Sequence, residues 1–236
     1  MEVLIVVEQE QRLSTAIENY LKTIYLLQQQ GEQVSTNGLA EQLNVKPASV
    51  SGMLKKLAEL HLVEHTPYYG VSVSPAGEKI ALEVLRHHRL IELYLVEALG
   101  YTWDEVHPEA EELEHVISEK LESRIAAWLG NPTHDPHGDP IPSPEGQVPH
   151  EASQPLDALE IGQRATVAQV RMQDADRLRY LASLGLVPGA SVELQSRAPF
   201  EGPLVIRVGT ESHILDTRLA KTIVVKDVQT DAESHL

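Results

Sequence analysis

A stretch rich in proline, glycine and aspartate, from Gly130 to Pro155, most limits how this chain of 236 residues can fold. Its segment NPTHDPHGDPIP has no hydrophobic period, and neither a helix interior nor a central strand tolerates prolines at this density. Before it, apolar residues recur at helical spacing, and after it they alternate or form short β-branched runs. We therefore expect a helical first part and a β second part, joined by a linker.

The start of the helical part predicts three helices followed by a short strand pair. The helices cover Arg12–Gln30, Thr36–Leu43 and Pro47–Leu60, and the strands cover residues 62–65 and 71–73. This is the order of a winged helix-turn-helix domain, whose second helix enters the major groove of DNA. An ordinary small helical domain with a solvated outer face is the alternative. The candidates for DNA contacts are small or basic and face outward: Lys46, Ser49, Ser51, Lys55 and Lys56.

Two further helices are predicted, one over residues 77–99 and one over residues 108–129, where Pro108 suits a first helical position. On the second of these, Glu111, Glu114 and His115 stand at i, i+3 and i+4 and share one face. Two carboxylates and an imidazole placed in this way can hold a divalent cation. A solvated acidic helix is the alternative for this pattern taken alone.

A second histidine–glutamate pair lies on the helix predicted over residues 77–99. His88 falls in the middle of its apolar arc and Glu92 at the edge, as i, i+4 neighbours that can share a metal ion. A carboxylate beside an apolar stripe needs a partner, because burying a lone charge is costly. A packed histidine with a solvated glutamate is the alternative, and His87 is expected in solvent. In the linker we expect solvation, and no metal, at the four potential ligands His134, Asp135, His137 and Asp139.

The charge distribution and the cysteine content limit which ions and ligands this chain can use. The net charge is −16, and residues 75–130 hold twelve acidic and five basic side chains, whereas residues 12–74 hold five of each. The predicted DNA-reading domain is therefore neutral, and the acidic middle attracts cations. Cysteine is absent, which excludes disulfides and thiolate ligands. Any metal must be held by O and N ligands, which favours Mn(II) or Fe(II) over thiolate zinc.

The same features predict a cytoplasmic protein. A chain without cysteine fits a reducing compartment. We find no apolar run long enough to cross a bilayer and no basic leader with a cleavage site at the start, so no membrane or secretory segment is expected.

Surplus apolar surface on the last two predicted helices suggests a homodimer, which suits a palindromic DNA operator. From Leu156 the pattern changes to short strands around a helix over residues 175–184, as in a small β-barrel. The expected fold is α+β and multidomain. It comprises a winged helix-turn-helix domain (1–74), a helical dimerisation and metal-binding domain (75–130), a Pro-rich linker (131–155) and a small barrel (156–236).

Several segments together resemble one family. They are LAEQLNVKPASVSGMLKKLAELHLVEHTPYYGVSVSPAGEKIA, RHHRLIELYL, VHPEAEELEHVIS, the linker piece HGDPIP, and RLRYLASLGLVPGASVEL with PFEGPLVIRV. The chain is similar over nearly its whole length to the diphtheria-toxin-repressor and manganese-transport-regulator family. Its last part looks like the Src-homology-3-like domain of ferrous-transport accessory type that many members carry.

The resemblance implies a metal-dependent transcriptional regulator that binds double-stranded DNA as a homodimer and is not an enzyme. It implies one metal site made by His88, Glu92 and His107. A neighbouring site is implied at Glu111, Glu114 and His115. Two further implied ligands are Asn19, from the first helix, and Asp174 or Asp176, from the C-terminal domain.

The resemblance also bears on which metal activates the protein. At the position of Glu111 the iron-responsive branch has Cys and the manganese-responsive branch has Glu, which favours Mn(II). Asn19 stands where these branches have Met and Asp, and Lys22 replaces a Glu of the two-domain manganese regulators. We expect a Mn(II)-activated repressor of metal-uptake genes, with Fe(II) as the alternative and other divalent transition metals binding in vitro.

Two other classes of protein are alternatives to a metal-dependent regulator. A metallohydrolase would use the His/Glu cluster for catalysis, but the sequence has no HExxH motif, nucleophile elbow or phosphate loop. A metal-independent winged-helix protein with a partner-binding C-terminal domain is the other reading, and a chelator separates it from the first.

Overall fold

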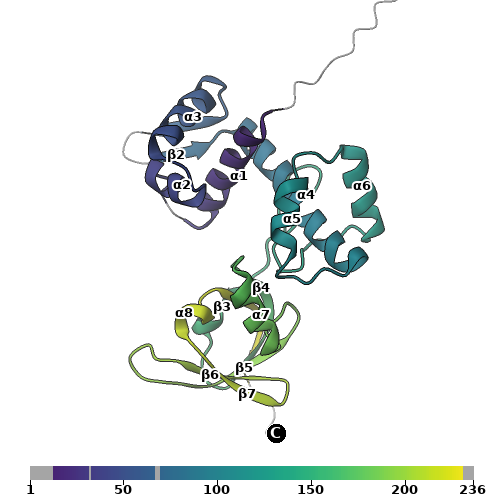
Figure 1. Ribbon diagram of the computed structural model, residues 1–236. Coiled ribbons are helices and arrows are strands. Elements are labelled where there is room, and N and C mark those ends of the chain that lie inside the picture. Colours follow the sequence, from purple (N-terminus) through teal and green to yellow (C-terminus); the bar gives the residue numbers. More distant parts are fainter. Residues whose placement is uncertain (1–12, 32, 67–69, 231–236) are drawn as a thin grey trace, which may run out of the picture. The chain divides into compact units, whose positions relative to one another are not determined.

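The computed structural model describes residues 13–31, 33–66 and 70–230 (Figure 1). Three parts of the expectations lie outside these residues: the helix start at Arg12, residues 67–69 between the two predicted strands, and the expected absence of a leader at the start of the chain. The chain divides into two compact units, residues 1–84 and 85–236, whose boundary lies inside one long helix. Among the described residues, no helix combines the length and the apolar character needed to span a membrane.

The first unit has the predicted order of three helices and a strand pair. Ser35 caps the second helix by accepting a hydrogen bond from the N–H of Gly38, and Pro47 opens the third helix, where its missing N–H is no loss. The two strands pair antiparallel, with Val63 opposite Val73. The elements are α1 (Thr15–Gln29), α2 (Thr36–Gln42), α3 (Pro47–Glu59), β1 (Val63–Thr66) and β2 (Gly70–Val73).

The core of the first unit follows the predicted stripes. Val50 and Leu57 of α3 are fully buried, which leaves the opposite face of this helix open. A Cβ at Gly77 would lie 2.0 Å from the carbonyl oxygen of Leu62, so the following helix approaches the hairpin only because this residue has no side chain. The predicted apolar stripe of α1 is buried throughout: Ile17, Tyr20, Leu21, Ile24 and Leu27.

Helix α4 (Pro75–Leu99) begins two residues before its predicted start. The single helix predicted over residues 108–129 is wrong, because the chain forms α5 (Val106–Leu113) and α6 (Glu119–Trp128) instead. Ser118 is extended and caps α6, since its hydroxyl accepts a hydrogen bond from the N–H of Leu121 at 3.3 Å. Two β-branched residues precede this cap and disfavour a continuous helix. Because α5 starts at Val106, Pro108 is its third residue.

Two apolar clusters hold the helices of the second unit together. One joins α4 to α5 through Ile91, Leu95, Val106 and Ala110. The other joins α4 to α6 and to the Pro-rich segment through Leu90, Ile125, Ala126 and Ile141. Arg86 of α4 reinforces the second contact, because it donates hydrogen bonds to Glu122 at 2.6 Å and to the carbonyl oxygen of Pro142 at 2.7 Å.

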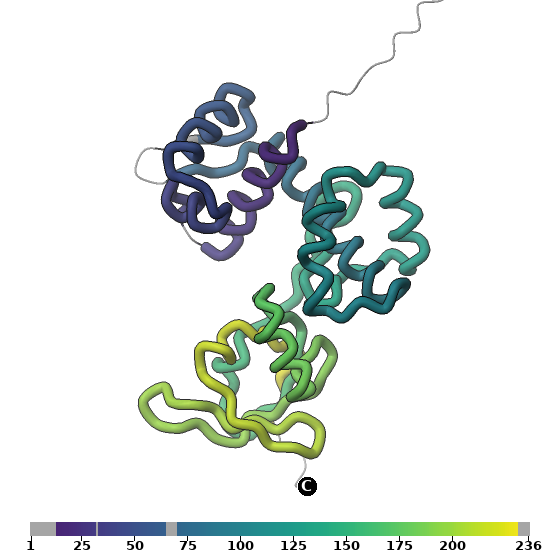
Figure 2. Tube along the Cα trace, viewed as in Figure 1, coloured from purple at the N-terminus to yellow at the C-terminus, as the bar shows by residue number. Residues whose placement is uncertain are grey.

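The Pro-rich segment, residues 131–153, has no helix and only one isolated bridge, between His134 and Pro140. Figure 2 follows its path from α6 to the sheet. It is nevertheless packed: Asp135 and His137 are 6% and 0% exposed, so the expectation that both are solvated is wrong. The carboxylate of Asp135 accepts the N–H groups of His137 and Asp139, which fixes the turn without any hydrophobic period.

Six strands follow in the order β3-β8-β4-β5-β6-β7, and all neighbours are antiparallel. Strands β3 and β7 lie at the two edges, so the structure has an antiparallel sheet, and closure into the predicted barrel stays a prediction. The predicted helix is confirmed as α7 (Ala175–Ser183), whereas β7 and α8 (Thr217–Ala220) were not foreseen. The strands are β3 (Gln154–Pro155), β4 (Gln163–Val170), β5 (Ser191–Arg197), β6 (Leu204–Val208), β7 (Glu211–Leu215) and β8 (Ile223–Thr230).

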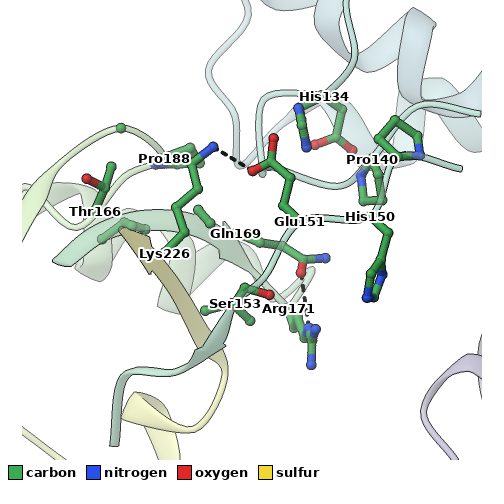
Figure 3. Close-up of a pocket in the computed structure, with 17 residues that line it drawn as sticks. His134, Pro140, His150, Glu151, Ser153, Thr166, Gln169, Arg171, Pro188 and Lys226 are labelled. Atoms are coloured by element: carbon green, nitrogen blue, oxygen red, sulfur yellow. Dashed lines mark hydrogen bonds and ion pairs between the residues drawn. The ribbon is translucent and has the colours of Figure 1, made fainter. Parts of the chain in front are cut away.

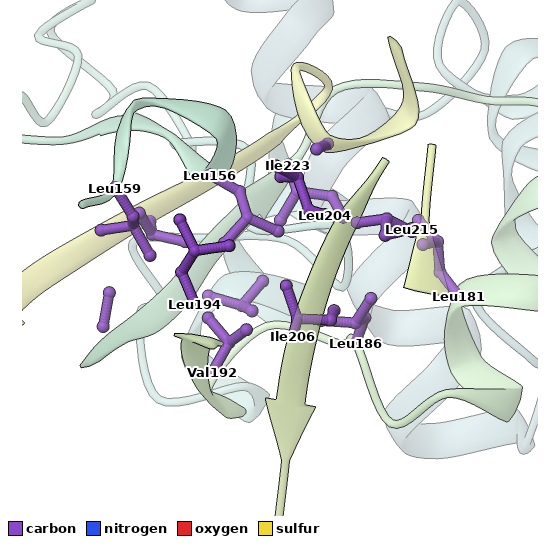
Figure 4. Packing of buried hydrophobic residues seen from close by; sticks show 14 of the residues in the cluster. Leu156, Leu159, Leu181, Leu186, Val192, Leu194, Leu204, Ile206, Leu215 and Ile223 are labelled. Atoms are coloured by element: carbon purple, nitrogen blue, oxygen red, sulfur yellow. The ribbon is translucent and has the colours of Figure 1, made fainter. Parts of the chain in front are cut away.

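One apolar core fills the C-terminal part of the second unit (Figure 4). Leucines from α7 and from the short 3-10 helix Leu156–Ala158 pack against the inward residues of the sheet. Trp103, from the turn between α4 and α5, packs against the same core. The helical part and the sheet of the second unit are therefore joined by buried contacts as well as by the chain.

Candidate metal centre

The cluster of potential metal ligands is built on two packed helices. His88 and Glu92 stand one turn apart on α4, and His107 and Glu111 stand one turn apart on α5. The apolar contact between these helices brings the two pairs together. Glu114, at the C-cap of α5, completes the cluster.

His88 lies at the middle of this cluster, with a different set of neighbours at each ring nitrogen. Nε2 is 3.0 Å from Glu92 Oε1 and 3.1 Å from His107 Nδ1. Nδ1 is 2.5 Å from Glu114 Oε2 and 3.9 Å from Glu111 Oε1. The residues predicted as two neighbouring sites therefore form one continuous cluster, which His88 joins.

His115 contacts this cluster at its edge. Its Nε2 lies 3.1 Å from Glu114 Oε1. The ligand atoms that lie within 4.8 Å of one another belong instead to His88, Glu92 and His107, and to His88, Glu111 and Glu114. His115 thus touches a member of the cluster but, among the described residues, joins neither group.

The remaining predicted ligands lie elsewhere. Asn19 is half-buried in the middle of α1, in the first unit, where its backbone carbonyl oxygen accepts a hydrogen bond from the hydroxyl of Thr23. Asp174 caps α7 by accepting the N–H of Arg177 at 2.9 Å, and the neighbouring Asp176 pairs with Arg179. In the described part of the chain, neither aspartate joins a group of potential ligands. The structure does not bring these C-terminal carboxylates to the centre.

A third group was missed by sequence reasoning. Glu92, Asp135 and His137 are all buried and place ligand atoms within 4.8 Å of one another. His137 Nδ1 lies 3.5 Å from Glu92 Oε2 and 4.0 Å from Asp135 Oδ2. Glu92 is thus shared, with Oε1 facing His88 and His107 and Oε2 facing His137. The only signal in the sequence was the close spacing of Asp135 and His137, and a segment without a period gave no reason to expect them buried.

Contacts on its other side fix the ring of His137. Nε2 donates a hydrogen bond to the carbonyl oxygen of Trp103 at 2.7 Å. The ring also stacks on the indole of Trp103, with centroids 5.7 Å apart and planes at 22°. Because Nε2 carries the proton, Nδ1 of the neutral ring presents a lone pair toward Glu92 and Asp135.

The pKa values of this group show an excess of negative charge. Burial alone would raise the pKa of Glu92, but the neighbouring imidazoles of His107, His137 and His88 outweigh it and hold this pKa well below its ordinary value. Burial, with the charges of Asp139 and Glu92, raises the pKa of Asp135 well above its ordinary value. Burial opposes a charged His137, yet Glu92 and Asp135 raise its pKa from 6.5 to about 9. A proton on His137 therefore supplies a positive charge where a cation would.

The donor set fits a divalent transition ion. Glu92 Oε2 and His137 Nδ1 are buried and have no hydrogen-bond partner in the structure. Buried polar atoms are rarely left unpaired, so two such atoms facing each other indicate a position for a cation. Carboxylate oxygens and imidazole nitrogens suit Mn(II) and Fe(II).

The candidate DNA contacts all lie on the open face of α3 or at its start, and all five are exposed. Lys46 is the N-cap residue of α3, and the Lys55 side chain is 81% exposed. The Ser51 hydroxyl donates a hydrogen bond to the carbonyl oxygen of Pro47 at 3.1 Å, so it is held close to the helix. The face is neutral to basic, as contact with phosphates requires.

A cavity of about 330 Å³ lies beside the Pro-rich segment, between it and strands β4 and β8 (Figure 3). Its charged groups are already paired: Lys226 bonds Glu151 at 2.6 Å, and Arg171 donates to Gln169 at 3.1 Å. Asp135 is one of its lining residues, but Glu92 and His137, the other two members of the ligand group of Asp135, do not line it. We assign no ligand to it.

Comparisons with known proteins agree with this arrangement. Residues 12–71 match the model "Iron dependent repressor, N-terminal DNA binding domain", residues 74–143 match "Iron dependent repressor, metal binding and dimerisation domain", and residues 154–227 match "FeoA domain". The chain is 30% identical over 223 residues to the iron-dependent repressor IdeR of Mycobacterium leprae, covering 89% of this chain and 96% of that one. It is 28% identical over 223 residues to the diphtheria toxin repressor of Corynebacterium glutamicum, covering 90% and 96%.

Solved structures of manganese regulators are similar as well. A manganese-dependent transcriptional repressor in complex with manganese is 40% identical, with a TM-score of 0.83, and the match covers 89% of this chain and 98% of that one. The manganese regulator SloR is 32% identical, with a TM-score of 0.74 over 89% and 97%.

Proposed function

The chain belongs to the family of iron- and manganese-dependent transcriptional repressors, and we propose that Mn(II) bound around His88 and Glu92 switches on its binding to DNA. The family consists of DNA-binding regulators, which are not enzymes. The observation that carries the proposal is the shared carboxylate of Glu92, which is fully buried among three histidines.

We assign the ligands by their donor atoms. His88, Glu92 and His107 would hold one ion and Glu111 and Glu114 another, with His115 recruited through its contact to Glu114. Asp135 and His137 extend the first group. Bound ions supply the positive charge that this acidic cluster needs. The fold positions the carboxylates and imidazoles, and these groups release on metal binding any protons that they carry in the metal-free state.

One further proposed ligand, Asn19, lies in the DNA-reading unit and would couple metal binding to DNA binding. We propose that Asn19 of α1 contributes its amide oxygen, so that metal binding favours one placement of the DNA-reading unit. The ion need only bind the DNA-competent form more tightly to shift the population toward it. The absence of cysteine and the carboxylate at Glu111 support Mn(II), and Fe(II) is the second candidate, as several relatives are iron-dependent repressors.

The assembly that we propose is a cytoplasmic homodimer on a palindromic operator upstream of metal-uptake genes. Three large apolar side chains on and before α6 support a dimer surface, since they are about half exposed or more: Val116 at 61%, Leu121 at 48% and Trp128 at 60%. Such residues rarely gather on a monomer without a partner.

The test is a DNA-binding titration with duplexes selected from a random library in the presence of Mn(II). Wild-type protein should bind with Mn(II) and release with a chelator. Glu111→Ala and His115→Ala should lose the metal response and keep their circular dichroism, while Glu112→Ala, an exposed neighbour on α5, should behave as wild type. Metal-dependent binding by both Glu111→Ala and His115→Ala would disprove the ligand assignment. DNA binding that is unchanged by the chelator would favour a metal-independent winged-helix protein. Activation at a lower concentration of Fe(II) than of Mn(II) would favour iron as the activating metal.

A further inference from the structure

His87 is a buried histidine that the centre does not use. It was expected in solvent, but it is only 6% exposed. Its Nδ1 lies 3.1 Å from the carbonyl oxygen of Glu114, and a carbonyl can only accept, so Nδ1 carries the proton. The lone pair of the neutral ring is therefore on Nε2.

This lone pair faces a carboxylate. Nε2 is buried, has no hydrogen-bond partner, and lies 3.6 Å from Oε1 of Glu119, the first residue of α6. That distance is too long for a hydrogen bond. Nε2 is cut off from water whereas the Glu119 side chain is 74% exposed, so a positive charge between them, either a proton or a metal ion, would satisfy both acceptors.

A third ligand favours the metal ion. Glu83 stands one turn before His87 on α4, and ligand atoms of Glu83, His87 and Glu119 all lie within 4.8 Å of one another. Two carboxylates and one imidazole are a donor set that a single divalent transition ion can take, whereas one proton can join only two of the three groups. The 3.6 Å separation also matches two ligands that are each about 2.1 Å from the same ion.

We propose that Glu83, His87 and Glu119 form a further site for a divalent transition ion, with one imidazole nitrogen and two carboxylate oxygens. Both glutamates are exposed, so the ion would keep water ligands and exchange readily. The site shares no residue with the centre around His88 and does not depend on the proposed function. A bound ion would tie the start of α6 to α4, next to the exposed apolar residues of α6.

The test counts Zn(II) ions on the full-length, tag-free protein after stripping with a chelator. Zn(II) is the probe because it binds N/O sites more tightly than Mn(II) or Fe(II). Equilibrium dialysis and mass spectrometry should give one ion fewer per chain for Glu119→Gln and for His87→Asn. The amide of an asparagine can take the place of Nδ1 and still donate to the Glu114 carbonyl, but it has no atom at Nε2. Glu112→Gln is the matched control and should bind as many ions as wild type.

Two further measurements separate this site from the centre. Glu119→Gln should remove one ion in a Glu92→Gln background as well, even if that background has already lost the ions of the centre. A crystal soaked in Zn(II) should give an anomalous peak at the Nε2 atom of His87. Equal ion counts for wild type, Glu119→Gln and His87→Asn would overturn the proposal and leave a proton between His87 and Glu119.

Discussion

The charge on His137 gives a direct test of the buried cluster. In metal-free protein its pKa is about 9, compared with an ordinary value of 6.5. This difference of about 2.5 units corresponds to about 3.4 kcal/mol in favour of the charged ring. Glu92 supplies the larger part of the favourable interaction, through its contact with Nδ1 and its charge, and the charge of Asp135 adds less. Replacing Glu92 by the isosteric Gln should therefore lower the pKa of His137 toward its ordinary value.

The sign of the effect on stability follows from linkage. The folded-state pKa of His137 is raised, so its stabilising contribution is complete below pH 6.5 and is lost as the pH rises through about 9. Metal-free wild type should lose up to about 3 kcal/mol of unfolding free energy from this residue over that range. Glu92→Gln should lose much less over the same range, because the pKa of its His137 differs less from the ordinary value and the ring therefore contributes less to stability.

The assay is a pH titration of the histidine ring nitrogens by NMR on chelator-treated protein, with His137 assigned by the signal that is missing in His137→Asn. Glu112→Gln changes the net charge by the same amount at an exposed site and serves as the control. If His137 titrates near 6.5 in wild type, or if Glu92→Gln leaves its pKa unchanged, the assigned contact between these residues does not hold in solution.

Three further predictions address the rest of the molecule. Gly138→Ala should lower the unfolding free energy by at least about 2 kcal/mol in thermal or urea unfolding, because φ is +83° and a Cβ would lie 1.9 Å from the Ala168 carbonyl oxygen. The control is Gly130→Ala, where φ is +78° but the space around the residue is open, and it should cost only about 1 kcal/mol. Val116→Asp should shift the sedimentation of the protein from dimer to monomer, and an unchanged dimer would rule out the proposed surface. Lys56→Ala should weaken DNA binding similarly for all sequences and reduce the salt slope by about one, and a loss confined to one operator sequence would instead indicate base contact.

Periodicity predicted the elements that bury one apolar face. The stripe of α1 was found from its spacing, the first residue of α2 from the cap residue Ser35, and the first residue of α3 from Pro47. The break after α5 was missed because apolar residues continue at helical spacing across it, although a serine followed by acidic residues in the next turn, Glu119 and Glu122, is typical of a helix start. Strand β7 was missed because four of its five residues are not buried, so it has no alternation to detect.

The metal candidates were predictable only in part. His88 and Glu92 were found because i, i+4 spacing on a helix fixes their proximity, whichever way the helix packs. His107 was placed by resemblance, since its distance to His88 depends on how α5 meets α4. Nothing in the sequence could show that His88 would face both predicted groups, because a side chain's rotamer is set by contacts that form only in the fold.

The Pro-rich segment shows why a stretch without a hydrophobic period can still be ordered. Its order comes from polar groups satisfying one another: Arg89 donates to the Pro140 carbonyl at 2.5 Å, and the His137 carbonyl accepts the N–H of Val170 in β4 at 2.8 Å. These bonds join α4 to the sheet through the same segment that places His137 against Glu92. Metal binding at the centre and the ordering of the Pro-rich segment are then linked, so each should favour the other. The Val170 amide should therefore exchange with solvent more slowly when Mn(II) is bound, and equal exchange with and without the metal would show that the segment is ordered independently of it.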